Sequence, residues 1–389
     1  MRRPAELNLS NWRQPPYSRW AFHHVGEIIP TQVISRGATA SALERALNPH
    51  LQQLAIDGIE GNSWSLQQWL EASSSDALLV AHRGRLVHEW YAHADIENCP
   101  HIVFSVSKSI TAALTGVLLE QGLLDTASRL EQLIPELAGS GFAGASLQQL
   151  LDMQIAIDFE ENYEVSSGKF IEYRTSTGWH PCALDQIDVN LHDFLCSLAA
   201  SGANHGETFA YKSPNSDLLG WILERASGES LSALLSRYLW QPMGAEADAC
   251  ITLDRKGAPR SAGGICVRPR DLLRFGELMR LRGQASGQQV VPAAWVDDCS
   301  GGGDSAAWLR SENSARFAEG NYRNQWYQSG NQQTAMLAIG IHSQWIYIDP
   351  ISEVTIVKLS AQDTALNADL SVVNIGAFSA ICEQVKLLG

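Results

Sequence analysis

A serine and a lysine three residues apart stand at the start of a strongly apolar segment. Ser105 and Lys108 follow Phe104, and small and apolar residues then recur with a helical period as far as Gly122. Three residues advance a helix by about 300°, so the two side chains project on nearly the same side. Burial would lower the pKa of the lysine, and a neutral amine can take the proton of a serine hydroxyl. The pair predicts a serine nucleophile at a helix N-terminus, where a developing oxyanion is favoured.

The Ser-x-x-Lys spacing alone is a weak signal, because the chain contains it twice. Ser166 and Lys169 have the same spacing, but their surroundings are polar and lack an apolar period, so we expect a solvated loop there. For Ser105 the alternative is a helix-capping serine followed by a surface lysine. The apolar approach over 102–104 and the alanine- and leucine-rich helix that follows favour burial instead.

Tyr211 precedes another predicted helix, over 216–226. A nearby Lys108 ammonium would favour the phenolate of Tyr211 by lowering its pKa, and the hydroxyl could then pass a proton to a leaving amine. Tyr327 begins the same Tyr-x-Ser-x-Asn pattern ahead of strands. We expect Tyr327 to line the wall of the substrate site and Tyr211 to transfer the proton. A packed tyrosine without a chemical role remains the alternative for Tyr211.

Composition excludes several classes of partner. The 389 residues are 45% hydrophobic and 18% charged, and the formal net charge of -14 disfavours nucleic acid or an anionic membrane as partner. The seven cysteines are widely spaced and form no Cys-x-x-Cys pair, which is typical of reduced thiols. We find no signal peptide or membrane span, and we expect a cytoplasmic protein.

Two motifs that suggest a metal or a cofactor fail on their context. His88-Glu89 and His93 imitate a zinc helix, but the histidines are five residues apart and lie in a predicted strand. The segment 139–144 spells Gly-x-Gly-x-x-Gly without a preceding strand, so it does not predict a dinucleotide site. We therefore expect no metal and no cofactor.

The remaining pattern has strand-forming segments at both ends of the chain and helices in the middle, which predicts a sheet completed by the C-terminal part and an inserted helical region. We expect residues 1–100 plus 251–389 to form an α/β domain and residues 101–250 a mainly helical domain, with the active site between them. Residues 1–40 would wrap the surface, and 159–182 would be an irregular binding loop. The predicted elements are a helix over 42–54, a hairpin over 77–82 and 85–91, strands over 335–341, 344–348 and 354–359, and a helix from Leu370.

The chain resembles the class C β-lactamase-like serine hydrolases, and within them it is most similar to 6-aminohexanoate-dimer hydrolases, which are related to family VIII carboxylesterases. The likeness runs from about His82 to the C-terminus. It rests on segments 104–109, 150–158, 177–179, 211–215, 263–264, 340–342 and 357–360. The resemblance implies a β-lactamase/transpeptidase-like fold of the α+β class, an α/β sandwich in which helices flank an antiparallel sheet and a helical region is inserted.

Matched by position, the resemblance implies that Ser105 is acylated, that Lys108 is its base and that Tyr211 is the second acid/base. Gly340 matches the glycine of the Lys-Thr-Gly motif, so the N–H of Ile341 would complete an oxyanion hole with that of Ser105. Tyr163 and Trp179 match aromatic residues that close over the bound amide. We also expect substrate contacts from Ser213, Gly340, His342 and Tyr327.

We expect a serine hydrolase that cleaves small linear amides or esters, a small-molecule substrate, through an acyl-enzyme. Ser213 stands where class C β-lactamases carry asparagine, and Ala338 replaces their motif lysine, so efficient β-lactam hydrolysis is not expected. Ala262 occupies a position that is polar in some dimer hydrolases, which leaves the specificity open. The alternatives are β-lactamase or D-amino-acid peptidase activity, acyl transfer, and a non-catalytic penicillin-binding-type protein. The sequence does not indicate the oligomeric state.

Overall fold

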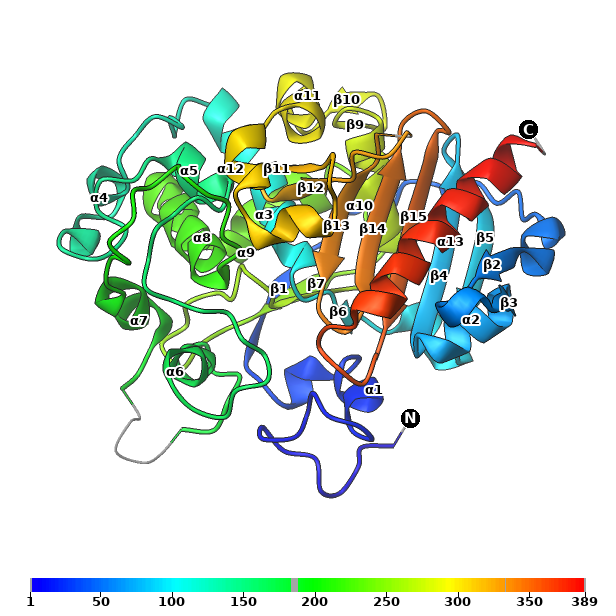
Figure 1. The fold of residues 1–389 in the computed structure, drawn as a ribbon, viewed down its shortest axis with the longest axis horizontal. Coiled ribbons are helices and arrows are strands. Elements are labelled where there is room, and N and C mark those ends of the chain that lie inside the picture. Colours follow the sequence, from blue (N-terminus) through cyan, green and yellow to red (C-terminus); the bar gives the residue numbers. More distant parts are fainter. Residues whose placement is uncertain (1, 183–187, 333, 388–389) are drawn as a thin grey trace.

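A seven-stranded antiparallel sheet forms the centre of the computed structural model, which describes residues 2–182, 188–332 and 334–387 (Figure 1). The strand order is β11-β12-β13-β14-β15-β4-β5, so the predicted N-terminal hairpin pairs with the last of the C-terminal strands. The expected hairpin, the three expected C-terminal strands and the fold class are confirmed. The strands are β4 (Ser75–His82), β5 (Arg85–Tyr91), β11 (Asn321–Arg323), β12 (Trp326–Gln328), β13 (Met336–Gly340), β14 (Gln344–Asp349) and β15 (Val354–Ser360).

Helices cover both faces of this sheet. Because successive side chains of a strand point to opposite faces, Leu79 of β4 packs in one apolar cluster while Leu78 and Val80 pack in another. The first cluster includes α3 (Val106–Glu120) and α10 (Pro269–Arg280), and the second includes α2 (Leu66–Ala72) and α13 (Ala368–Lys386). In Figure 1, α13 crosses the front of the sheet and α10 lies behind it.

A second, four-stranded sheet leads into the helix that begins after Ser105. Its antiparallel order is β1 (Thr31–Ile34), β7 (Ala249–Thr252), β8 (Ile265–Val267) and β6 (His101–Ile102). The chain passes from β6 through Val103, whose N–H donates to the Ile265 carbonyl at 2.9 Å, and reaches the helix three residues later. Pairing in this sheet therefore fixes the start of α3.

The middle of the chain supplies most of the helices beside the large sheet. They are α4 (Leu130–Leu133), α5 (Leu147–Leu151), α6 (Lys169–Ser176), α7 (Leu191–Ser197), α8 (Ser213–Ser227) and α9 (Leu231–Leu235), continued by a π-helical turn, Ser236–Trp240. Other short elements are α1 (Ser18–Ala21), β2 (Ala55–Asp57), β3 (Ser63–Ser65), β9 (Gln284–Ala285), β10 (Gln288–Gln289), α11 (Ala293–Gly301) and α12 (Ser305–Leu309). One-turn 3₁₀ segments occupy Val25–Glu27, Pro49–Gln53, Ile59–Gly61, Ala94–Asn98, Pro135–Leu137 and Glu312–Ala315.

Several predicted elements are wrong. The helix expected over 42–54 is mostly extended or irregular, with one 3₁₀ turn, Pro49–Gln53, because Pro49 and a capping Asn48 start a helix there. The segment 159–182 is not wholly irregular, since it contains α6. The N-terminal residues do not merely wrap the surface: Trp12, Trp20 and Phe22 are buried in a third apolar cluster. Tertiary packing decides these segments, and local pattern does not reveal it.

The division into two domains stays a prediction. Among the described residues, no helix combines the length and the apolar character needed to cross a membrane. No disulfide joins two cysteines among the described residues.

Candidate active site

Ser105 is held by a strained turn at the start of α3. The preceding residue, Phe104, has a positive φ of 43°, which is costly for a bulky side chain. Phe104 is buried and packs against the rings of Phe22 at 4.9 Å and Trp179 at 5.9 Å. This aromatic packing compensates the strain and directs Ser105 into a cleft.

The helix α3 is more deeply buried than its sequence period suggests. We expected one buried face, but every residue from Val106 to Leu118 is buried, because the helix runs between the large sheet and the helical layer. The Ser107 hydroxyl also accepts from the Ile265 N–H at 3.1 Å, which ties the first turn to β8. The nucleophile candidate therefore stands on a rigid element.

Lys108 is buried beside Ser105, as expected, with 1% of its surface exposed. Its Nζ donates to Ser105 Oγ at 2.8 Å, to Ser213 Oγ at 3.0 Å and to the Ala262 carbonyl at 2.8 Å. Desolvation lowers the pKa of Lys108 to about 8, although the Glu161 carboxylate opposes that shift. A neutral amine is therefore accessible near neutral pH, in hydrogen-bond contact with the serine hydroxyl.

Tyr211 completes a compact triad, but its acidity differs from our expectation. Its hydroxyl shares a hydrogen bond with Ser105, and its ring lies 5.0 Å from Lys108 Nζ. Burial, together with the nearby Tyr327 and Glu161, raises the pKa of Tyr211 well above its ordinary value. The expected stabilisation of a phenolate by Lys108 is wrong, because desolvation outweighs it. Tyr211 is a neutral phenol that can donate a proton.

The end of β13 approaches Ser105 because residue 340 is glycine. A Cβ at Gly340 would lie 2.6 Å from the Val103 carbonyl oxygen, closer than a methyl group can come. Ile341 follows, and both Ile341 and Ser105 line the same two cavities. This approach is what an oxyanion hole made of two backbone N–H groups requires.

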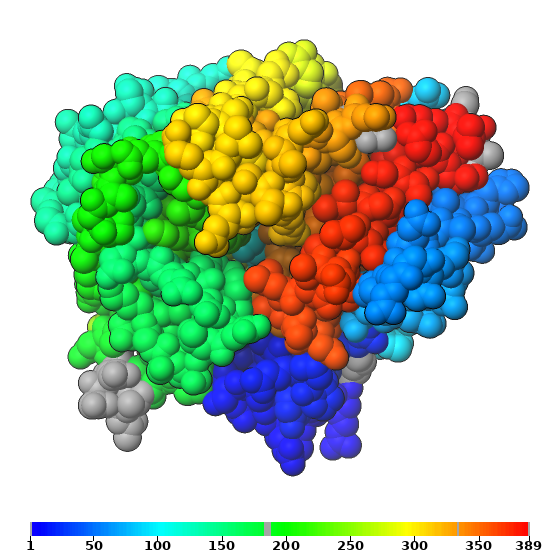
Figure 2. All heavy atoms as spheres, viewed as in Figure 1, coloured from blue at the N-terminus to red at the C-terminus, as the bar shows by residue number. Residues whose placement is uncertain are grey.

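Two cavities meet at Ser105. The larger has a volume of about 250 Å³, and Tyr211 and Tyr327 form part of its wall. Figure 2 shows a hollow here between green, yellow and orange-red parts of the surface. The smaller has a volume of about 20 Å³ and extends towards Trp179 and three arginines. Both are also lined by Glu161 and Tyr163, so a linear substrate could place one end in each cavity with its carbonyl at Ser105.

Most of the predicted contact residues lie around these cavities. Tyr163, Ser213, Gly340, Tyr327 and Trp179 each line at least one of them. Trp179 is a fixed wall, since its indole N–H donates to Thr252 Oγ1 at 3.0 Å and 3% of its surface is exposed.

The prediction that His342 contacts the substrate is wrong, because His342 lines neither of the two cavities. Its ring is buried beside Phe22 and Phe104, and its Nδ1 lies 2.7 Å from the Gln362 carbonyl oxygen. Burial lowers the pKa of His342 to about 4, so it packs as a neutral ring behind the site.

Glu161 is the site residue that the sequence did not reveal. Its carboxylate accepts from the Ser213 N–H at 2.5 Å, from Ser213 Oγ at 2.8 Å and from the Tyr163 hydroxyl. Ser213 thus receives a hydrogen bond from Lys108 and passes one to Glu161. Nothing in the polar stretch around Glu160 and Glu161 distinguishes the two carboxylates, so only the fold could show which one faces the cleft.

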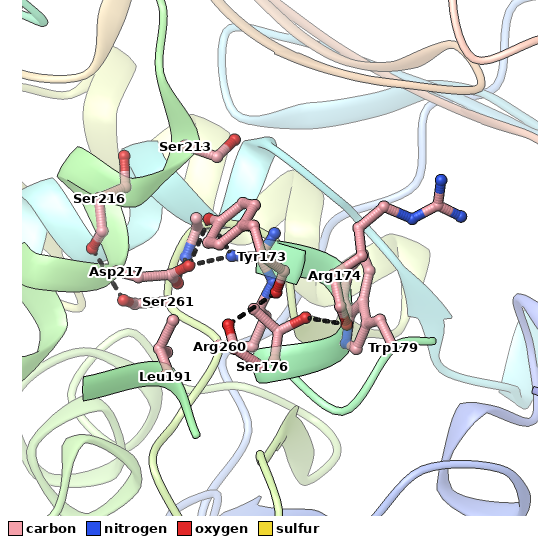
Figure 3. A network of polar contacts seen from close by, with 12 residues as sticks. Tyr173, Arg174, Ser176, Trp179, Leu191, Ser213, Ser216, Asp217, Arg260 and Ser261 are labelled. Atoms are coloured by element: carbon pink, nitrogen blue, oxygen red, sulfur yellow. Dashed lines mark hydrogen bonds and ion pairs between the residues drawn. The ribbon is translucent and has the colours of Figure 1, made fainter. Parts of the chain in front are cut away.

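A buried network of polar side chains fixes the floor of the smaller cavity. Arg260 forms an ion pair with Asp217 and also donates to the Tyr173 hydroxyl (Figure 3). The other oxygen of Asp217 accepts from the Ala262 N–H at 2.8 Å. Because the Ala262 carbonyl accepts from Lys108, this network orients the candidate base.

One cluster of potential metal ligands lies elsewhere. Among the described residues, His23, Asp76 and His101 bring ligand atoms within 4.8 Å of one another. Asp76 already forms an ion pair with Arg19 at 3.0 Å, and His101 Nδ1 lies 2.7 Å from the Ile102 carbonyl oxygen. The cluster is explained by its role in joining the N-terminal segment to β4 and β6.

Comparisons with known proteins show which family and which solved structures the chain is similar to. A family model described as Beta-lactamase matches residues 67–371. The chain is 36% identical over 356 residues to the 6-aminohexanoate-dimer hydrolase of Paenarthrobacter ureafaciens, covering 92% of this chain and 88% of that protein.

Solved structures show the same fold. A protein of Bacillus anthracis, provisionally assigned as a 6-aminohexanoate-dimer hydrolase, superposes with a TM-score of 0.90 at 24% identity, over 99% of both chains. A family VIII carboxylesterase superposes with a TM-score of 0.60 at 14% identity, over 87% of this chain and all (100%) of that one.

Proposed function

The chain belongs to the beta-lactamase family and is a serine hydrolase, and from this premise we propose that it cleaves small linear amides or esters through an acyl-enzyme on Ser105. The observation that carries the proposal is the contact of Ser105 Oγ with the buried Lys108 amine at 2.8 Å. The relative named 6-aminohexanoate-dimer hydrolase supports a linear amide that joins short aliphatic chains.

In the first step, neutral Lys108 takes the proton of Ser105 while Ser105 Oγ attacks the substrate carbonyl carbon. The backbone N–H groups of Ser105 and Ile341 stabilise the oxyanion, and one such donor is typically worth about 3 kcal/mol. Tyr211 then donates its proton to the leaving nitrogen or oxygen, the carbonyl bond to it breaks, and the Lys108 ammonium restores the phenol.

In the second step, water enters on the leaving-group side and attacks the acyl-enzyme. Lys108 and Tyr211 act in reverse, taking the proton of water and returning one to Ser105. The product is a carboxylic acid, and the protein groups end as they began. Every proton is carried by a residue of this chain.

We also propose a cytoplasmic location. The seven cysteines form no disulfide within the described residues, and four of them are only partly buried, which fits a reducing compartment.

The proposal is tested by labelling the nucleophile. A fluorophosphonate probe should add one adduct to the wild-type protein, as seen by intact mass, and peptide mapping should place it on Ser105. Ser105→Ala should lose both the adduct and the hydrolysis of p-nitrophenyl esters. The matched control is Ser166→Ala, which changes the exposed copy of the Ser-x-x-Lys pattern and should keep both. Labelling or turnover that survives in Ser105→Ala contradicts the proposal.

A further inference from the structure

The smaller cavity beside Ser105 is unusually basic. Arg13 of the N-terminal segment, Arg174 of α6 and Arg260 all line it, and we refer to these three residues as the basic pocket. The acid on its wall, Glu161, is engaged with Ser213 and Tyr163. The three cations come from parts of the chain far apart in sequence, which the fold brings to one site.

Arg260 has its charge compensated inside the protein. It pairs with Asp217 and lies between two aromatic rings, 4.5 Å from the centre of Tyr173 and 4.9 Å from that of Trp179. Figure 3 shows the side chains of Tyr173, Asp217 and Arg260 meeting in one bonded group. This arginine is a fixed part of the pocket floor.

Arg174 has no carboxylate to compensate its charge, although its guanidinium lies 5.8 Å from the centre of the Phe170 ring. No carboxylate among the described residues forms an ion pair with it, and its Nε is buried without a hydrogen-bond partner. In Figure 3 its guanidinium extends away from the bonded group. Burial and the neighbouring Arg260 lower the pKa of Arg174 to about 10, so the cation is destabilised in the unliganded protein.

Arg13, which also lines the cavity, shows the same pattern. Its Nε is also buried without a hydrogen-bond partner, and its guanidinium lies 5.5 Å from the centre of the Trp12 ring. A buried donor without a partner costs free energy, and a buried cation without an anion costs more. Two partly buried guanidinium groups that line one small cavity would be satisfied by an anionic ligand.

We propose that the basic pocket binds a carboxylate at the end of the acyl half of the substrate, so that the preferred substrates are amides or esters of short dicarboxylic acids. This inference rests on the proposed function. The acyl half is assigned to this side because Tyr211, the proton donor to the leaving group, lines the other cavity. The volume of about 20 Å³ restricts the acyl chain to a short one.

The test compares three p-nitroanilides whose acyl chains have matched length. The acyl chain is that of glutaric acid, which ends in a carboxylate, that of its monomethyl ester, which ends in a methyl ester, or that of an ω-amino acid, which ends in an ammonium. In each, the anilide C–N bond breaks and a bond forms from the acyl carbon to Ser105 Oγ. For the wild-type protein, kcat/KM for the carboxylate should exceed that for the methyl ester by about tenfold or more, as charge-assisted hydrogen bonds imply.

Arg174→Gln should abolish this preference, and Arg174→Glu should turn it towards the ammonium substrate. The matched control is Arg255→Gln, which removes an exposed arginine that donates to the Thr175 carbonyl outside the cavity, and which should keep the wild-type ratio. Equal kcat/KM values for carboxylate and methyl ester, or a preference that survives in Arg174→Gln, would overturn the inference.

A second experiment measures the binding of a free carboxylate and does not depend on turnover. Free glutarate should slow fluorophosphonate labelling of Ser105 in the wild-type protein and in Arg255→Gln, but not in Arg174→Gln, and absence of protection in the wild type also overturns the inference. Labelled Ser105 without a charge preference contradicts the basic pocket alone. Failure of Ser105 to be labelled contradicts the proposed function itself.

Discussion

Replacing Glu161 by glutamine should shift the pH dependence of catalysis to lower pH. If Lys108 must be neutral to take the serine proton, kcat/KM of the wild-type protein rises with pH through the pKa of Lys108, about 8. The negative charge of Glu161 raises that pKa. Glutamine keeps an acceptor for Ser213 and removes the charge, so the neutral amine should form at lower pH.

The size of the shift follows from the geometry. Lys108 Nζ and Glu161 Oε1 bond to the same Ser213 hydroxyl, at 3.0 and 2.8 Å. Opposite charges about 5 Å apart interact by about 3 kcal/mol at an effective dielectric constant of about 20. One pKa unit corresponds to about 1.4 kcal/mol, and solvent in the open cavity screens part of the interaction, so we expect a shift of about one to two units.

The assay is the pH profile of kcat/KM for a p-nitrophenyl ester, measured for both proteins. Glu160→Gln is the matched control: it removes the neighbouring, exposed carboxylate and should leave the profile where it is. An ascending limb that stays in place or moves to higher pH in Glu161→Gln would refute the coupling of Glu161 to the base.

Three further changes test other parts of the account. Tyr211→Phe should lower kcat for p-nitroanilides by about 10²-fold or more, and much less for p-nitrophenyl esters, whose leaving group needs no proton; equal losses on both substrates would argue against a proton donor. Gly340→Ala should lower kcat by about tenfold or more while the circular dichroism spectrum is unchanged, because the added Cβ displaces Ile341 from Ser105; wild-type kcat would show that this approach is not needed. Burial lowers the pKa of Lys358 from 10.5 to about 7. Between pH 7 and pH 10.5, Lys358 therefore binds a proton in the unfolded chain but not in the folded one, so the free energy of unfolding should rise with pH over this range. Lys358→Met should flatten this rise in Tm, and an unchanged slope would contradict the shift.

The sequence predicted the chemistry of the site better than its surroundings. Ser105, Lys108 and Tyr211 could be found because a helical period, a short spacing and a family motif coincide, and the structure brings them together. The family, the fold class and the enzyme class are confirmed as well. The hairpin and the C-terminal strands followed from short apolar runs bounded by turn residues, which is the pattern of a strand buried on both faces.

Other features depend on tertiary contacts that no local pattern contains. Glu161 and Glu160 are alike in sequence, and only the fold shows which one binds Ser213. The acidity of Tyr211 was mispredicted because burial outweighs the nearby amine. His342 was expected at the substrate because the segment 340–342 resembles the family, but a positive φ of 58° at His342 accompanies a turn that buries its ring among aromatic residues.

The central claim is that burial lowers the pKa of the Lys108 amine to about 8, so that a fraction of it is neutral near physiological pH and can activate Ser105. The most direct test is an NMR titration of the protein labelled with ¹³C-lysine, following the Cε shift of Lys108, which is assigned by its absence in Lys108→Arg. We predict a midpoint near pH 8. A midpoint near 10.5, the ordinary value for lysine, would contradict the account.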